Sequence, residues 1–305
     1  MRLALLFSGQ GGQVPAHWQQ VRAGLDGPLR EALLAALPGI AEEGTAPAPE
    51  TLARNAIAQP LIFAQQMLLW AQLREKLPRP ICVAGYSLGE MAACCVAGVF
   101  PMATGLALTV ERARLMDGAA PGEHGMLAVL GLDDARVKTL AAEAGLAVAI
   151  RNAPCHLVVA GPRAGIDAAA QAFAAAGASR LVHLAVRTPS HTPLLAKAAA
   201  AFADCLAALP DGRLAVPVLS AIDATPARSV AAAGAALARQ ICTPLDWAAC
   251  QQAIVELQPD VVLEIGPGNA LTRLFNEFAP TIPARAADDF RSVDGIVAWL
   301  QANHR

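Results

Sequence analysis

The chain has 305 residues, of which 55% are hydrophobic and 16% are charged, and its formal net charge is −2. This composition supports a large buried core and excludes both a disordered chain and a basic surface for nucleic acid. No apolar run has the length of a membrane span or of a signal peptide, and the seven cysteines lack metal-type spacing, so we expect a reduced, cytoplasmic protein.

The first predicted element is a buried strand over residues 3–7, which ends in a glycine-rich turn from Ser8 to Gln13. Glycines let the backbone approach a ligand closely, but no Gly-Lys-Ser/Thr follows, so a nucleotide phosphate loop is not expected. The next predictions are a helix over residues 29–45, a loop over 46–50, and a helix from Ala58 to about Leu77 with Pro60 in its first turn.

A Gly-x-Ser-x-Gly sequence over residues 85–89 stands between an apolar strand and a helix of small residues. This pattern, in this strand–turn–helix context, is typical of a nucleophile elbow. Its serine, Ser87, would lie at a helix N-terminus, where free N–H groups favour the negative charge of an oxyanion. The alternative is an ordinary glycine turn of an α/β protein, and the flanking elements favour the catalytic interpretation.

Residues 125–186 carry short elements in the order β-α-β-β-α-β, which is the order of a ferredoxin-like unit. The predicted strands are 125–131, 146–150, 157–160 and 181–186, and the predicted helices are 133–144 and 165–176. We therefore expect residues 125–186 to form a small subdomain inserted into a large domain of residues 1–124 and 187–305.

Strands and helices alternate through the rest of the chain, which predicts an α/β fold with a mostly parallel sheet. The strand over 261–265 is apolar on both faces, as a strand covered by helices on both sides should be. Further predicted helices are 101–119, one ending at residue 208, 231–241, 244–256, 270–278 and 293–303, with strands at 216–219 and 282–285.

A nucleophilic serine needs a base, and His191 is the preferred candidate because it follows a strand end and opens a helix. Geometry decides the base, so the other histidines stay open, namely His17, His124, His156, His183 and His304. No acid stands out as a third member. Glu90 and Asp223 are alternatives, and a backbone carbonyl can also orient an imidazole.

Ordered motifs over almost the full chain resemble those of the malonyl-CoA:acyl carrier protein transacylases. The matching pieces are Phe7–Gln13, Gln59-Pro60, Gly85–Glu90, Arg112 with Met116, Asn152, Pro189–His191, Arg239-Gln240 with Pro244 and Trp247, and Gly266–Gly268 with Leu271-Thr272. The resemblance implies a large α/β-hydrolase-like domain with the inserted ferredoxin-like subdomain. It also implies transfer of malonyl from malonyl-CoA to the thiol of an acyl carrier protein, with no bound cofactor and no metal.

Carried over by position, Ser87 resembles the acylated nucleophile and His191 its base. Gln10 and Leu88 resemble the two backbone N–H donors of the oxyanion hole, and Arg112 resembles the arginine that meets the malonyl carboxylate. Two kinds of residue complete the implied site: Gln240, whose backbone carbonyl orients the histidine, and the pocket candidates Tyr86, Asn152 and Gln59.

Two positions depart from the family pattern, because Tyr86 stands where the family usually has His and Ser8 stands where it usually has Pro. Tyr86, the segment Asn55–Pro60 and the tail Asp288–Ser292 with Gly295 and Trp299 resemble the epsilon subunit of bacterial malonate decarboxylase. That subunit primes the carrier protein of its own enzyme, and this is the role that the resemblance implies here.

Three alternatives remain beside it: a transacylase of fatty-acid synthesis, a serine thioesterase or other hydrolase, and a non-catalytic subunit. An α/β-hydrolase places its histidine late, after an acid, whereas His191 lies mid-chain. A non-catalytic role fits poorly because every matched catalytic position is filled. The expected partners are malonyl-CoA and a carrier protein, with neither nucleic acid nor membrane.

Overall fold

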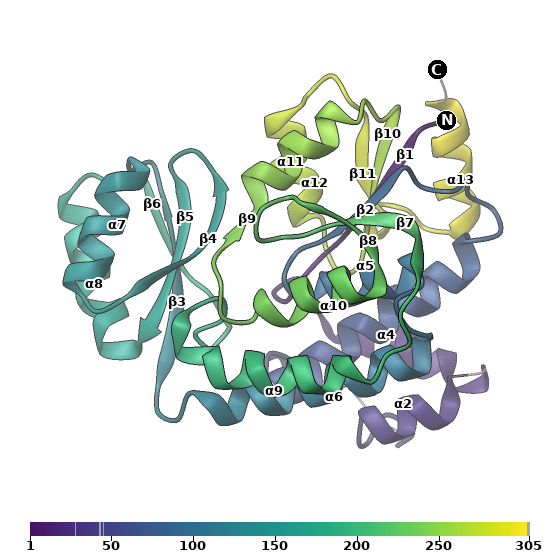
Figure 1. The fold of residues 1–305 in the computed structure, drawn as a ribbon, viewed down its shortest axis with the longest axis horizontal. Helices are drawn as coiled ribbons and strands as arrows, with labels where there is room; N and C mark the ends of the chain where they lie inside the picture. Colours follow the sequence, from purple (N-terminus) through teal and green to yellow (C-terminus); the bar gives the residue numbers. More distant parts are fainter. Residues whose placement is uncertain (28, 43, 45, 304–305) are drawn as a thin grey trace.

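The computed structural model describes residues 1–27, 29–42, 44 and 46–303, which form two groups of elements side by side (Figure 1). The larger group is built on a six-stranded sheet of order β11-β10-β1-β2-β7-β8. Its strands are β1 (Leu3–Phe7), β2 (Cys82–Gly85), β7 (Arg213–Leu219), β8 (Pro226–Ser229), β10 (Val261–Ile265) and β11 (Ala284–Ala286). Every neighbouring pair is parallel except β7 with β8.

The central strands β1 and β10 are buried along their whole length, which is why both sequences are almost continuously apolar. Leu3, Leu5 and Phe7 pack into one core cluster, while Ala4 and Leu6 pack into another on the opposite face. Because β1, β2 and β10 are parallel neighbours, the loops that follow them meet at one edge of the sheet, where α/β proteins bind ligands.

Helices cover both faces of this sheet (Figure 1). The first core cluster is formed with α1 (Pro15–Ala23), α2 (Arg30–Ala36), α3 (Pro49–Leu52), α4 (Asn55–Leu73), α5 (Gly89–Ala97), α6 (Met102–Ala119), α9 (Ala196–Ala207), α10 (Val230–Arg239) and α13 (Val293–Ala302). The opposite cluster is formed with α11 (Trp247–Glu256) and α12 (Ala270–Phe278). None of the helices in the described part of the chain is long and apolar enough to cross a membrane.

A second sheet has the order β6-β3-β5-β4-β9 and lies at the left in Figure 1. Its first four strands are antiparallel and are β3 (His124–Leu130), β4 (Ala147–Ala153), β5 (His156–Pro162) and β6 (Arg180–His183). The helices α7 (Asp134–Glu143) and α8 (Arg163–Ala175) share a core with these strands. The elements thus follow the predicted β-α-β-β-α-β order, while the division of the chain into two domains remains a prediction.

The fifth strand of this sheet, β9 (Leu245–Asp246), comes from the far part of the chain and pairs in parallel with β4. The prediction of a helix from 244 was therefore wrong at its start. Helix α11 begins at Trp247, with the Asp246 side chain accepting a hydrogen bond from the Ala249 N–H. Two residues of strand leave no periodic signal that sequence reasoning could use.

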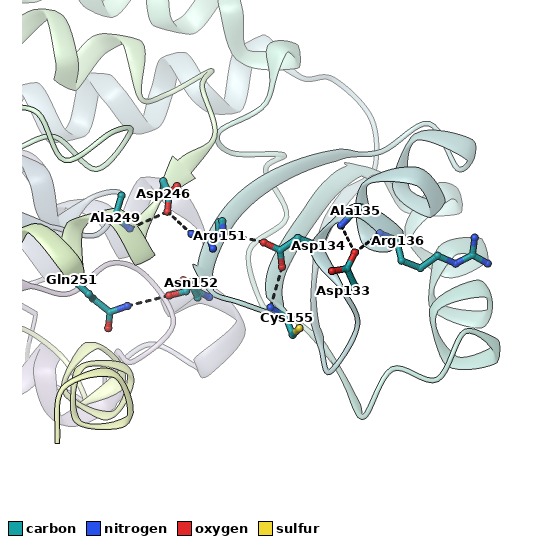
Figure 2. A network of polar contacts seen from close by, with 10 residues as sticks. All are labelled: Asp133, Asp134, Ala135, Arg136, Arg151, Asn152, Cys155, Asp246, Ala249 and Gln251. Atoms are coloured by element: carbon teal, nitrogen blue, oxygen red, sulfur yellow. Dashed lines mark hydrogen bonds and ion pairs between the residues drawn. The ribbon is translucent and has the colours of Figure 1, made fainter.

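Polar contacts fasten β4 to this strand and to α11 (Figure 2). Arg151 lies between two carboxylates, 2.9 Å from Asp134 and 3.3 Å from Asp246. The Gln251 amide donates to the Asn152 carbonyl at 3.1 Å. Because Arg151 and its partners are partly exposed, each ion pair adds little stability. These contacts therefore determine the geometry with which the two sheets are joined, and they contribute little to stability.

Three helices in the first part of the chain differ from the prediction. Helix α2 covers only Arg30–Ala36 of the predicted 29–45, since Pro38 follows and Gly39 has a φ of +85°; residues 43 and 45 lie outside the described part. A short helix, α3, begins inside the predicted loop at 46–50. Helix α4 begins earlier than predicted, at Asn55, and ends at Leu73, so Pro60 lies in its interior, where it removes one backbone hydrogen bond.

Candidate active site

Ser87 stands at the apex of the turn between β2 and α5, with a φ of +54°. A serine in this left-handed region is strained, so the surrounding structure must hold it there. The flanking glycines leave no room for side chains. A Cβ on Gly85 would lie 2.1 Å from the Glu90 nitrogen, and one on Gly89 would lie 2.0 Å from the Phe7 oxygen. The two glycines therefore allow the turn to pack closely against β1, with the serine at its tip.

His191 lies in hydrogen-bonding contact with this serine. Its Nε2 is 2.8 Å from Ser87 Oγ, and its Nδ1 is 2.6 Å from the Gln240 backbone carbonyl oxygen. A carbonyl only accepts, so Nδ1 carries the hydrogen and Nε2 is left to accept from the hydroxyl. The His191 N–H also donates to the Ile241 carbonyl at 2.9 Å. This geometry can take a proton from Ser87.

The surroundings of His191 keep its imidazole neutral. The residue is 1% exposed, and burial lowers its pKa to about 3, with nearby Arg112 acting in the same direction and the Gln240 carbonyl opposing it. A neutral imidazole is the form that can act as a base.

No carboxylate contacts the Nδ1 of His191 within the residues that the structure describes; Asp223, one of the two acids considered, contacts Arg239 instead. The histidine is thus oriented by a backbone carbonyl. Among the other histidine candidates, His17 pairs with Asp288 and His156 contacts Asn152, while His304 lies outside the described residues.

Two backbone N–H candidates for an oxyanion hole come from the loop after β1 and from the elbow. Leu88 follows Ser87 directly, and Gln10 lies in the loop that begins at Ser8. That loop lies against the elbow, since a Cβ on Gly9 would be 2.6 Å from the Tyr86 carbonyl oxygen. The structure therefore brings the loop of Gln10 close to the turn that carries Ser87.

Arg112 on α6 is fully buried, and part of its guanidinium is unsatisfied. Its Nη1 donates to Gln59 Oε1 at 2.7 Å, whereas Nε and Nη2 have no hydrogen-bond partner among the described residues. Burial lowers its pKa to about 10, which still leaves the group charged at neutral pH. Two adjacent free donors on a buried cation match a carboxylate that binds side-on. Arg114, by contrast, is exposed and pairs with Glu111.

Tyr86 and Asn152 join the two sheets beside the serine. The Tyr86 hydroxyl donates to Asn152 Oδ1 at 2.9 Å, and its ring packs edge-on against Trp247 with centroids 5.4 Å apart. Tyr86 belongs to the elbow, whereas Asn152 belongs to β4. Both were predicted as pocket residues, but nothing in the sequence indicated that they contact each other.

Further polar residues hold the turn that precedes His191, and sequence reasoning did not find their roles. The Asn55 amide donates to Thr188 Oγ1 and to Asp117 Oδ1, both at 2.7 Å. These three residues also line a cavity of about 550 Å³ whose rim carries Arg54 and Arg187. Asn55 was noted only as part of a subgroup segment, because a contact across 133 positions leaves no local signal.

The arrangement does not include a metal cluster. Among the described residues, no group of three or more His, Cys, Asp or Glu side chains could hold a metal ion. The polar groups at the site are instead a serine, a histidine, a buried arginine and backbone N–H groups, which together suit acyl transfer at a carbonyl that bears a nearby anion.

Comparisons with known proteins agree with this chemistry. Residues 30–287 match a family model described as an acyl transferase domain. The chain is 31% identical over 300 residues to the malonyl CoA-acyl carrier protein transacylase of Salmonella typhimurium, covering 94% of this chain and 96% of that protein.

Solved structures share the fold. The malonyl-CoA:acyl carrier protein transacylase of Xanthomonas oryzae pv. oryzae matches with a TM-score of 0.87 and 32% identity over 99% of both chains. A malonyl-transacylase solved in complex with a type II polyketide synthase acyl carrier protein matches with a TM-score of 0.87 and 30% identity, over 98% of this chain and 99% of that one. These matches confirm the predicted α/β class with its two sheets.

Proposed function

The chain belongs to the acyl transferase domain family, and we propose that it moves a malonyl group from malonyl-CoA to the thiol of an acyl carrier protein through a malonyl-Ser87 ester. The observation that carries the choice of malonyl is Arg112, a buried guanidinium with unpartnered Nε and Nη2. A buried cation without an anion is costly, so these two free donors favour a substrate that brings a carboxylate.

In the first half-reaction, His191 takes the proton of Ser87 as Oγ attacks the thioester carbonyl. The carbonyl oxygen becomes an oxyanion, which the N–H groups of Gln10 and Leu88 stabilise. The carbon–sulfur bond then breaks, the CoA thiol leaves with the proton from His191, and the malonyl ester of Ser87 remains. The carrier thiol reverses these steps by giving its proton to His191 and taking the acyl group.

The cavity beside Thr188 supports the proposal that the substrate carries a phosphate-bearing arm. Its rim carries the exposed side chains Arg54, Arg163 and Arg187, which suit the phosphates of CoA and of a carrier protein's prosthetic group. One relative was solved in complex with its acyl carrier protein, and we propose that this chain likewise binds an acyl carrier protein.

The finer proposal is that this carrier is the carrier subunit of a malonate decarboxylase. Tyr86 and the tail Asp288–Ser292 support it, because both resemble that enzyme's epsilon subunit. In the structure, Asp288 Oδ2 accepts from the Gly268 N–H at 2.6 Å, so the tail reaches the turn after β10. A transacylase of fatty-acid synthesis is the second candidate, since the relatives are named malonyl-CoA:acyl carrier protein transacylases and none of those names mentions a decarboxylase.

Intact mass after incubation with malonyl-CoA tests the proposal. The wild type should gain one malonyl group that persists in water and is cleared by a thiol, and Ser87→Ala should gain none. An ester that water clears quickly would indicate a hydrolase instead. Adding candidate carrier proteins of one genome in turn then separates the decarboxylase carrier from that of fatty-acid synthesis.

Acyl selectivity tests the role of Arg112, with Arg114 as a matched control on the same helix. Arg112→Ala should lose about 10²-fold or more in kcat/KM for malonyl-CoA, as expected when a buried charge pair loses one partner, while acetyl-CoA should lose far less. Arg114→Ala should be close to neutral for both. An equal loss for the two substrates would assign Arg112 to the fold alone.

A further inference from the structure

Glu90 is a buried carboxyl group that the steps above do not use. It lies in the first turn of α5, beside the elbow, and is 1% exposed. Its Oε2 accepts from Gln240 Nε2 at 3.2 Å and from the Ala221 N–H at 3.4 Å. A carboxyl group removed from water is tolerated only with such partners, so its contacts indicate what it holds in place.

Gln240 links this carboxyl group to both members of the reactive pair. Its Nε2 also donates to the Ser87 backbone carbonyl at 2.9 Å, and its own backbone carbonyl accepts from His191 Nδ1. An amide nitrogen has two hydrogens, and Ser87 and Glu90 take one each. Gln240 Oε1 is buried and has no hydrogen-bond partner in the described part of the chain. The two donated bonds are therefore the polar contacts that fix this side chain.

We propose that Glu90 is a positioning residue, which holds Gln240 and, through it, the His191 ring in the arrangement that meets Ser87. The inference rests on the Ser87–His191 pair of the proposed function. Although no carboxylate contacts His191 Nδ1, Glu90 would still act on the histidine, through the side-chain amide and the backbone carbonyl of Gln240. Without it, the second amide hydrogen of Gln240 would be buried and unpaired, and the side chain would be free to turn.

The charge state of Glu90 provides a signature of this role. Burial raises its pKa to about 8, opposed by the Ala221 N–H and by Arg112. The other charged or titratable groups around it are Asp223 after β7, Arg239 on α10, Cys94 on α5 and Cys250 on α11. Glu90 is thus neutral at pH 7 and becomes an anion above pH 8. A nearby anion favours the imidazolium that forms as His191 takes the serine proton, so reactivity should rise through this range.

An uncharged alkyl fluorophosphonate tests the inference, because it reacts with a base-activated serine and carries no malonyl group. At pH 7, Glu90→Ala should label Ser87 about tenfold more slowly than the wild type, the effect of one unpaired buried donor. Glu90→Gln keeps an acceptor for Gln240 and should label within about threefold of the wild type. The wild-type rate should rise near pH 8, and the Glu90→Gln rate should not.

Glu264 offers a matched control, since it is also a fully buried glutamate but lies on strand β10, and burial raises its pKa to about 7. It caps α12 by accepting hydrogen bonds from Leu271 and Thr272, and within the described part of the chain it makes no hydrogen bond with Gln240. Glu264→Ala should lower the melting temperature and leave the labelling rate of the folded protein unchanged.

The outcomes of this experiment distinguish a failure of the Glu90 inference from a failure of the proposed function. Wild-type labelling by folded Glu90→Ala, or identical pH curves for the wild type and Glu90→Gln, would reduce Glu90 to a core residue and overturn the inference. If Glu90→Ala does not fold, the pH curve of Glu90→Gln decides alone. Labelling of Ser87→Ala at the normal rate would contradict the reactive pair, and with it the proposed function.

Discussion

Two turns of the molecule each hold a non-glycine residue in the left-handed backbone region, with a φ of +54° at Ser87 and +63° at His191. The turn of Ser87 is specified by its own glycines at 85 and 89, where any side chain would collide with backbone atoms. The turn of His191, over residues 187–193, contains no glycine. It is held by partners far away in the chain, at Ile241 and Asn55.

This difference shows two ways of stabilising strain at a functional site. The serine turn is determined locally, so its conformation can be read from a short sequence. The histidine turn has two local hydrogen bonds, from the Ser190 N–H to the Thr188 carbonyl and from Thr192 Oγ1 to the Pro189 carbonyl. Its other partners lie on α4 and at the end of α10, so its conformation also depends on the packing of those elements. The two turns should therefore fail in different ways when they are altered.

The largest expected effect follows from Gly89→Ala. The added Cβ would lie 2.0 Å from the Phe7 oxygen and 2.6 Å from its carbon, and backbone of a central strand cannot move aside. We expect loss of the folded, labelled protein by circular dichroism and intact mass. The control is Gly118→Ala on α6, where nothing lies within 4 Å of the added Cβ, so that variant should gain roughly 0.5–1 kcal/mol. A folded, active Gly89→Ala protein would contradict the local account of the elbow.

His191→Ala should leave the fold intact and slow acylation of Ser87 by about 10²–10⁴-fold, the contribution of a general base. The reason is that α4 and α10 still hold the backbone of its turn after the imidazole is removed. Stopped-flow release of CoA measures the rate, and the melting temperature shows whether the fold is kept. An unchanged rate would mean that another group activates the serine.

The same contrast explains what could be predicted from the sequence. The elbow, the strand at 261–265 and the element order of residues 125–186 depend on local patterns, and they were predicted with small errors at their ends. Strand β9 and the pairing of Asn55 with Thr188 depend on residues that meet only in the folded chain. The same holds for Glu90, whose partner Gln240 is 150 positions away. Such contacts have no spacing rule, so no reading of one sequence can supply them.

A smaller effect is expected from Asn55→Ala, which alters the support of the histidine turn without touching His191. The change removes two hydrogen bonds but leaves the one from Thr188 Oγ1 to Asp117 Oδ1 at 3.2 Å, so we expect a cost of about 1–2 kcal/mol. Acylation should slow by about tenfold, with a matching fall in the melting temperature. Asn276→Ala is the control, because Asn276 also donates from its side-chain amide, in this case one hydrogen bond to the Ala284 carbonyl, but lies on α12. Equal acylation rates in the two variants would mean that residues 187–190 need no such support.

The smallest expected effect is an absence of change on acidification, and it tests the burial of the histidine turn. Burial lowers the pKa of His191 to about 3, from an ordinary value near 6.5. In the folded protein the imidazole therefore stays neutral, and Ser87 should be labelled at a constant rate between about pH 7 and pH 5. In the unfolded chain the same histidine gains a proton below its ordinary pKa, so this group favours unfolding as the pH falls from about 6.5 towards 3. Labelling by the fluorophosphonate should thus remain flat while the melting temperature declines. A rate that falls with a midpoint near 6.5 would show that the base is solvated like a surface histidine, and that its turn is not held closed by α4 and α10.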